Sequence, residues 1–163
     1  MKTEKARERQ EMKEGPERKI RGFEDLHTWQ ACRDLRVFIS TVVKALPKDE
    51  KYRLVDEMIR SSRAASALIA EGYGRYHFKE NIQCCRQSRG EPHELLDHLI
   101  VAKDEGFIGE SEYEEGRRLT LRAIELVNGY IRFLQTQEAS QGKGMARGNA
   151  RQKTEASDRG ERL

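Results

Sequence analysis

The chain has 163 residues, 31 Lys and Arg against 28 Asp and Glu, and a formal net charge of +3. Its length suits one domain, and its mean hydropathy of −0.87 predicts that part of it stays unfolded. No apolar run approaches the roughly 20 residues of a membrane helix, and residues 1–21 lack the apolar centre of a signal peptide. We therefore expect a cytoplasmic protein.

The two ends of the chain differ in composition from its middle. Residues 1–22 are mostly Lys, Arg and Glu, and residues 138–163 are rich in Gln, Gly, Ser, Lys and Arg without a periodic pattern. Both compositions are typical of disordered tails. We expect the folded part to be residues 23–137.

Four helical patterns occupy this middle segment. The first spans residues 26–46 and stops at Pro47, which cannot continue a helix. Its apolar stripe is Cys32, Leu35, Ile39, Val42 and Leu46. The second spans residues 49–73, and its small side chains between residues 61 and 67 allow a neighbouring backbone to approach closely. It runs into the sequence IAEGYGR, where Gly72 and Gly74 are expected to adopt the left-handed conformation that ends a helix.

The third pattern spans residues 78–105 and ends at Gly106. The fourth spans residues 111–137, with Ser111 as the expected N-cap and Glu114 at the capping-box spacing. No strand pattern competes, and short loops make successive helices antiparallel neighbours. The sequence therefore predicts an all-α, antiparallel up-down four-helix bundle.

The fourth helix carries apolar residues over an unusually wide arc, which must be covered on more than one side. Either a second subunit supplies part of that cover, or the helix is fully buried within the monomer. One stripe is Leu119, Ala123, Leu126, Tyr130 and Phe133, and the other is Leu121, Ile124, Val127, Ile131 and Leu134.

Charge is distributed unevenly. Basic residues outnumber acids by eight to five in residues 1–22 and by six to four in residues 138–163. In residues 23–137, acids outnumber bases by nineteen to seventeen. Within the core, residues 51–89 hold eight bases against four acids, and residues 90–125 hold ten acids against four bases. A basic surface attracts phosphate, and the candidate nucleic-acid contacts are Arg60, Arg63, Arg75, Lys79, Arg86 and Arg89.

The alternative for these residues is an ordinary solvated helix face. Asp56 and Glu57 lie four and three residues before Arg60, at spacings that partly neutralise it. The acidic stretch 90–125 offers a different role, as a recognition surface for a protein partner.

No motif in the sequence indicates catalysis. His93 and His98 are five residues apart, about 140° around a helix, so they cannot share one metal ion without distortion. The three cysteines have no CxxC spacing and are interpreted as small buried or half-buried thiols in a reducing compartment, rather than as metal or redox centres. GxxxxGK[ST] and GxGxxG are both absent. We expect a non-enzyme without metal or cofactor.

Three segments resemble one known family. FEDLHTWQACRDL (23–35), IAEGYGR (69–75) and AKDEGFI (102–108) are similar, in order and spacing, to motifs of the bacterial 23S rRNA intervening-sequence proteins. The resemblance covers about residues 23–133. It implies a homo-oligomeric ring, a pentamer, and a link to RNA. The accessory subunit of diversity-generating retroelements has a similar bundle, which makes a reverse transcriptase an alternative partner.

The third helix departs from the family pattern. Several positions where relatives carry larger apolar residues hold polar or small ones, and Pro92 is expected to kink or break the helix. These positions are Asn81, Cys84, Cys85, Gln87 and Pro92; in the second helix, Ser66 and Leu68 replace the usual Pro and Asn.

Overall fold

The computed structural model describes residues 20–75 and 77–160, with side chains described as far as Gly142. Its four long helices are α2 (His27–Val42), α3 (Leu54–Tyr73), α4 (Phe78–Asp104) and α5 (Glu110–Gly160). Short 3-10 helices lie at Phe23–Asp25 (η1), Val43–Ala45 (η2) and Lys48–Glu50 (η3), and this part of the chain contains no strand. Most of the predicted N-terminal tail, residues 1–19, lies outside the described residues.

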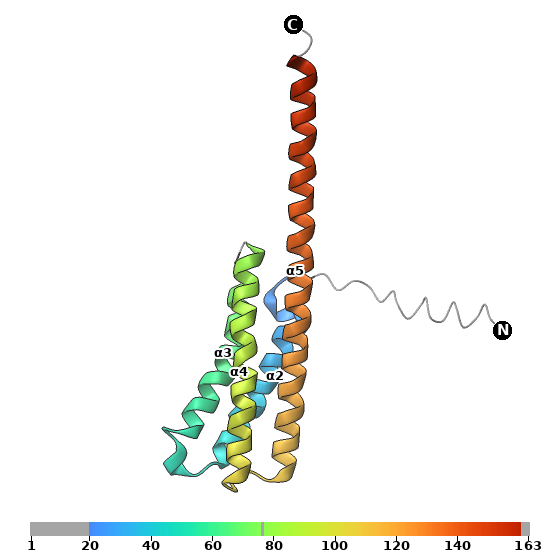
Figure 1. Cartoon of the computed structure of the whole chain (residues 1–163). Helices are drawn as coiled ribbons and strands as arrows, with labels where there is room; N and C mark the ends of the chain where they lie inside the picture. Colours follow the sequence, from blue (N-terminus) through green and yellow to red (C-terminus); the bar gives the residue numbers. More distant parts are fainter. Residues whose placement is uncertain (1–19, 76, 161–163) are drawn as a thin grey trace, which may run out of the picture.

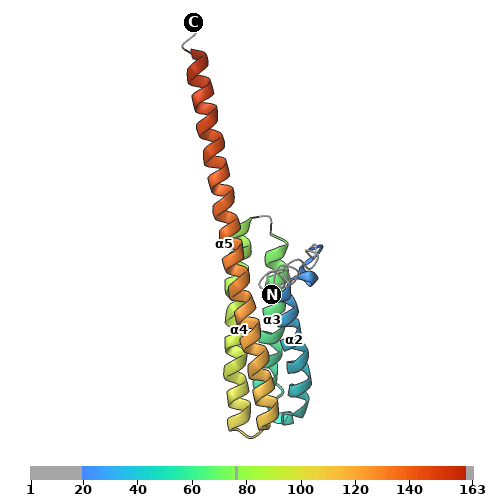
Figure 2. The same cartoon turned by 90° about the vertical axis from the view of Figure 1, so that its right-hand side faces the viewer.

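The four helices form the predicted up-down bundle (Figures 1 and 2). α3 packs against α2 and α4, and α5 packs against α4 and α2, so each helix contacts its two neighbours. The largest fully buried side chains come from all four helices and include Leu35, Met58, Leu95 and Val127. Among the described residues, no helix is both long and apolar enough to cross a membrane.

Several helix ends differ from the prediction. α2 ends at Val42 rather than residue 46, because residues 43–45 form η2. α3 begins at Leu54 rather than residue 49, because residues 48–50 form η3 instead. α5 begins at Glu110, and the backbone N–H of Gly109 donates to Glu112 Oε2 at 3.1 Å. Glu112 thus makes the bond back to the helix start that a capping box uses, in place of the expected Ser111 and Glu114.

α5 also continues beyond the predicted end at Gln137. The helix runs to Gly160, where the sequence analysis placed a tail from residue 138. Residues 137–141 include Gln, Glu and Ala, which favour helix, and contain no proline. The Ser140 hydroxyl donates back to the carbonyl of Thr136 at 2.9 Å.

α3 and α4 approach each other through small residues, as the sequence predicted. A Cβ on Gly72 would lie 2.7 Å from Asn81 Oδ1 and 3.0 Å from Cys84 Cβ. Farther along the same contact, Ser88 Oγ donates to the carbonyl of Ala65 at 2.7 Å. Gly72 is therefore required for space.

The left-handed conformation expected at Gly72 and Gly74 does not occur. Gly74 has φ −74°, and its N–H donates to the carbonyls of Ala70 and Glu71. The one positive φ among the described residues belongs to Gly106, at +73°. Gly106 follows the end of α4, which confirms the predicted termination there.

The unusual residues of α4 fit the core. Pro92 is fully buried within a helix that continues on both sides of it, so this proline does not end α4. Asn81, Cys84 and Cys85 are also buried. Asn81 Nδ2 donates to the Tyr130 hydroxyl of α5 at 3.4 Å, and Cys85 Sγ lies 3.4 Å from Asn81 Oδ1. Gln87 is exposed and needs no partner in the core.

The chain itself covers most of both apolar stripes of α5. Ala123 and Val127 are fully buried, and Ile131 and Leu134 nearly so. Leu119, Leu126 and Tyr130 pack partly buried against the same core. Only Leu121 and Phe133 are largely exposed, at 41 % and 54 %. The width of the apolar arc is thus explained mainly within the monomer.

The close approach at Gly72 can be tested with two glycine substitutions. We expect Gly72→Ala to lower the free energy of unfolding by about 1–2 kcal/mol, because overpacking costs more than Ala contributes as a helix former. Gly90→Ala is the matched control, since its added Cβ would meet nothing within 4 Å. It should raise stability by about 0.5–1 kcal/mol. Urea unfolding measures both, and a stabilised Gly72→Ala protein would contradict the close-packing interpretation.

Candidate nucleic-acid interface

α4 carries three exposed cations on its outer face. Lys79, Arg86 and Arg89 are spaced by seven and three residues, which places them on one side of the helix. Arg89 Nη1 donates to Asn128 Oδ1 of α5 at 3.1 Å, and Lys79 Nζ lies 3.9 Å from Glu138 Oε1. These two contacts align residues 128–138 of α5 with the N-terminal part of α4.

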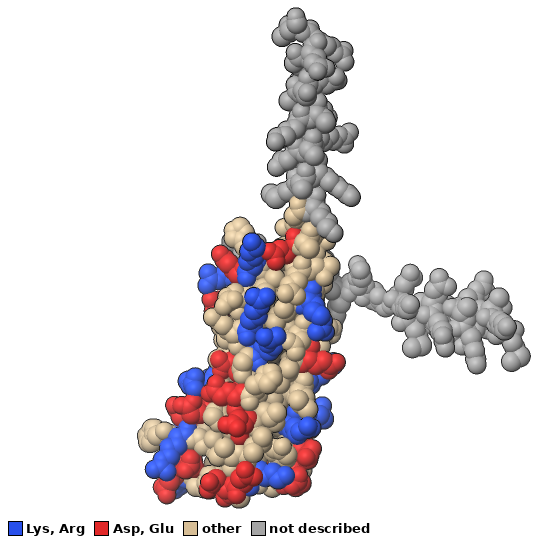
Figure 3. Space-filling view, viewed as in Figure 1, with Lys and Arg blue, Asp and Glu red and all other residues tan. Residues whose placement is uncertain are grey.

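This alignment adds a cation that sequence reasoning missed. Arg132 is exposed and lies one helical turn after Asn128, between the two points of contact with α4. We call Lys79, Arg86, Arg89 and Arg132 the α4–α5 basic surface. Figure 3 shows Lys and Arg side chains following one another down the upper part of α4. Arg132 is 43 residues beyond Arg89, so only the antiparallel packing of α4 and α5 brings them together.

Two other predicted contacts are paired with acids. Arg75 Nη2 lies 2.6 Å from Glu71 Oε1, and this hydrogen bond raises the pKa of Arg75. Arg60 donates to Glu57 within α3 and to Glu94 Oε1 of α4 at 3.1 Å. The bond to Glu57 is the main cause of the raised pKa of Arg60. The expected pairing of Arg60 with Glu57 is confirmed, and both arginines have an acidic partner within hydrogen-bond distance.

Arg63 points away from the other cations. Gly72 faces α4, and Arg63 lies nine residues earlier, about 180° around α3. It is exposed on the side of α3 opposite to α4. The structure therefore brings together Lys79, Arg86 and Arg89 of the six predicted residues and separates Arg63 from them.

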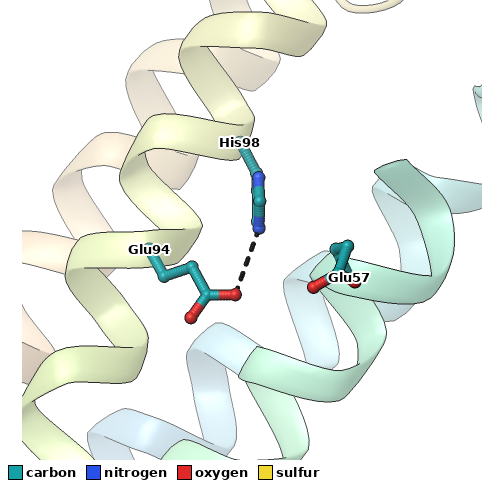
Figure 4. Close-up of side chains that lie close together, drawn as sticks. All are labelled: Glu57, Glu94 and His98. Atoms are coloured by element: carbon teal, nitrogen blue, oxygen red, sulfur yellow. Dashed lines mark hydrogen bonds and ion pairs between the residues drawn. The ribbon is translucent and has the colours of Figure 1, made fainter. Parts of the chain in front are cut away.

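A second group of charged residues lies between α3 and α4, nearer the other end of the bundle. Glu57 from α3 and Glu94 and His98 from α4 offer ligand atoms that all lie within 4.8 Å of one another (Figure 4). His98 Nε2 is 3.4 Å from Glu94 Oε1. We call these three residues, with Arg60, Ser61 and Glu91, the α3–α4 cluster.

Hydrogen bonding and burial act on the carboxylates of this cluster in opposite ways. Ser61 Oγ donates to Glu94 Oε1 at 2.8 Å, and that bond is the main reason why the pKa of Glu94 is lowered. Burial, followed by the charge of Glu94, raises the pKa of Glu91. Glu94 and His98 are four residues apart in α4, whereas Glu57 is 37 residues from Glu94 and reaches the cluster only through the packing of α3 on α4. His93 is elsewhere, with Nδ1 2.9 Å from the carbonyl of Arg89.

All three cysteines are free and buried, as interpreted from the sequence. Burial raises the pKa of Cys32 to about 12 and that of Cys85 also to about 12. A thiol must ionise to act as a nucleophile or metal ligand. Burial therefore disfavours the thiolate form of Cys32 and of Cys85.

Comparison with models of known families shows to which family this chain belongs. The family model of the 23S rRNA-intervening sequence protein matches residues 24–129. The chain belongs to this family. A comparison with curated proteins found no match. The family match includes α2, α3, α4 and α5 as far as Gly129, so it contains Arg86, Arg89 and the α3–α4 cluster but ends before Arg132.

The raised thiol pKa values predict low reactivity in the folded protein. With a pKa of about 12, the thiolate fraction of Cys32 and Cys85 at pH 8 is on the order of 10⁻⁴. We expect iodoacetamide to alkylate both slowly in native buffer and rapidly in denaturant, as followed by peptide mass spectrometry. Rapid labelling of either residue in the native protein would show that its site opens readily.

Proposed function

We propose that this family member is a non-catalytic, cytoplasmic helical protein that binds RNA through the α4–α5 basic surface and acts as a homo-oligomer. The observation that carries the proposal is the convergence of four cations from two helices. Among the described residues, no carboxylate pairs with Arg86, Arg89 or Arg132, and Lys79 meets Glu138 only at 3.9 Å. The family's description, which names the 23S rRNA, agrees with an RNA ligand.

The chemistry of these side chains suits a phosphate backbone. A guanidinium presents several donors in a fixed plane and binds phosphate oxygens in pairs. Each neutralised phosphate also releases counterions, so affinity depends on salt. Residues 23–137 carry a small excess of acids, so binding should be confined to this surface rather than spread over the bundle.

Four cations alone provide modest affinity, and self-association would compensate for that. An oligomer repeats the same surface and raises the effective affinity for a long RNA. The exposed Leu121, Phe133 and Val37 supply apolar area for contacts between subunits. The family resemblance implies a ring, and we propose a pentamer.

A protein partner is the second candidate, and it rests on a different part of α4. Ile100 and Val101 are each 39 % exposed, with Asp97 and Asp104 nearby on the same helix. Exposed apolar residues next to acids suit a basic protein surface, for example that of a reverse transcriptase. A reverse transcriptase gene adjacent to this one would favour this role, and a surrounding rRNA gene would favour RNA binding.

RNA binding should depend on the α4–α5 basic surface and on salt. We expect Arg86→Ala with Arg89→Ala to weaken binding of a 23S rRNA fragment and to reduce the slope of log affinity against log salt by about 1 for each lost phosphate contact. Fluorescence anisotropy at several salt concentrations measures both quantities.

The matched control removes two arginines from elsewhere. Arg63→Ala with Arg75→Ala deletes the same formal charge, but Arg63 is on the opposite side of α3 and Arg75 is paired with Glu71. It should change affinity little. An equal loss of affinity in both double variants would indicate a general charge effect and contradict a defined surface.

The oligomeric state is a separate expectation. Light scattering during size-exclusion chromatography should give a mass several times that of one chain, and five times for a pentamer. Phe133→Ser should reduce that mass, because a polar residue would replace an exposed ring. A monomer at micromolar concentration would contradict the repeated-surface proposal.

A further inference from the structure

The α3–α4 cluster combines three carboxylates with only one guanidinium. Glu57, Glu91 and Glu94 surround Arg60, which leaves an excess of two negative charges when His98 is neutral. Figure 4 shows Glu57 on one helix facing Glu94 and His98 on the other. The side chain of His98 is 17 % exposed, whereas those of Glu57 and Glu94 are 45 % and 38 % exposed. The group is therefore partly shielded yet open to ions from solution.

Glu91 is the least satisfied member of the cluster. Its Oε2 is shielded from solvent and has no hydrogen-bond partner among the described residues. Polar atoms in such positions usually have a partner, because an unpaired buried acceptor costs free energy. Together with the excess negative charge, this unpartnered oxygen makes a further cation in the cluster electrostatically favourable.

The donor geometry is close to that of a metal site. A tetrahedral ion with ligands at 2.0–2.2 Å holds its ligand atoms about 3.4 Å apart. His98 Nε2 and Glu94 Oε1 are already 3.4 Å apart. Glu57 is within 4.8 Å of both, so a small movement of its flexible side chain would complete three ligands.

Arg60 holds the place that an ion would take. It donates to Glu57 and to Glu94 Oε1, which are two of the three potential ligands. Its side chain is 56 % exposed, so the guanidinium can move into water without disturbing the core. An ion and Arg60 would therefore compete for the same carboxylates.

We propose that Glu57, Glu94 and His98 bind a divalent transition-metal ion, which displaces Arg60 and links α3 to α4. One imidazole nitrogen with two carboxylates suits Zn²⁺ or a similar ion better than Ca²⁺ or Mg²⁺, which prefer oxygen ligands alone. Three protein ligands leave a fourth position for water. This site is independent of the RNA-binding surface.

The test is titration of chelator-treated full-length protein with ZnCl₂, by calorimetry and by thermal unfolding. We expect saturable binding of one ion per chain and a higher midpoint of unfolding, since a ligand that binds only the folded state stabilises it. His98→Ala and Glu57→Gln should each weaken binding at least about tenfold. CoCl₂ in place of zinc should give a visible absorption band that both variants lose.

Two variants distinguish binding at this site from nonspecific metal binding. His93→Ala removes an exposed histidine from the same helix, outside the cluster, and should leave zinc affinity unchanged. Arg60→Ala removes the competitor and should increase the affinity several-fold while keeping all the ligands. Equal losses in the two histidine variants, or unchanged or weaker binding in Arg60→Ala, would overturn the proposal, as would the absence of one-to-one binding by the unaltered protein.

Discussion

α3 and α4 lie close together because small residues line their contact, and the α3–α4 cluster depends on this approach. Gly72 leaves room for Asn81 and Cys84, and Ser88 bonds the backbone of Ala65. Farther along, the same approach places Ser61 of α3 within 2.8 Å of Glu94 of α4. A larger residue at position 72 would therefore force α3 and α4 apart near Asn81 and Cys84.

Much of this architecture could be predicted from periodicity alone. Four helices, their order and the end of α4 at Gly106 follow from apolar spacing and breakers. The errors concern residues whose role depends on a neighbouring helix. Gly72 was expected to supply a special backbone angle, but its small volume is what matters. Pro92 gave no sign in the sequence of its place in the core, and the helix continues through it with the ring completely buried.

The functional surfaces were less predictable, because each combines residues that are distant in the chain. The sequence indicated Lys79, Arg86 and Arg89 among six basic candidates, and their spacing within α4 places these three on one side of the helix. Arg132 joins them only through the pairing of α4 with α5. In the same way, Glu94 and His98 are four residues apart in one helix, whereas Glu57 comes from α3. The sequence analysis also grouped Arg63 with the other basic candidates. Proximity along the chain does not reveal on which side of a helix a residue lies.

The contact at Gly72 also constrains how this sequence can change over time. Residues 72, 81 and 84 share one small volume, since a methyl group on the first would meet side-chain atoms of the other two. Volume added at one position must be removed at another, so the effects of substitutions at these positions are not independent. Larger side chains at positions 81 and 84 would thus require a compensating shift of α3. Related chains are expected to show correlated replacement at these three positions. Such a correlation, seen in sequences alone, would indicate how closely α3 and α4 pack.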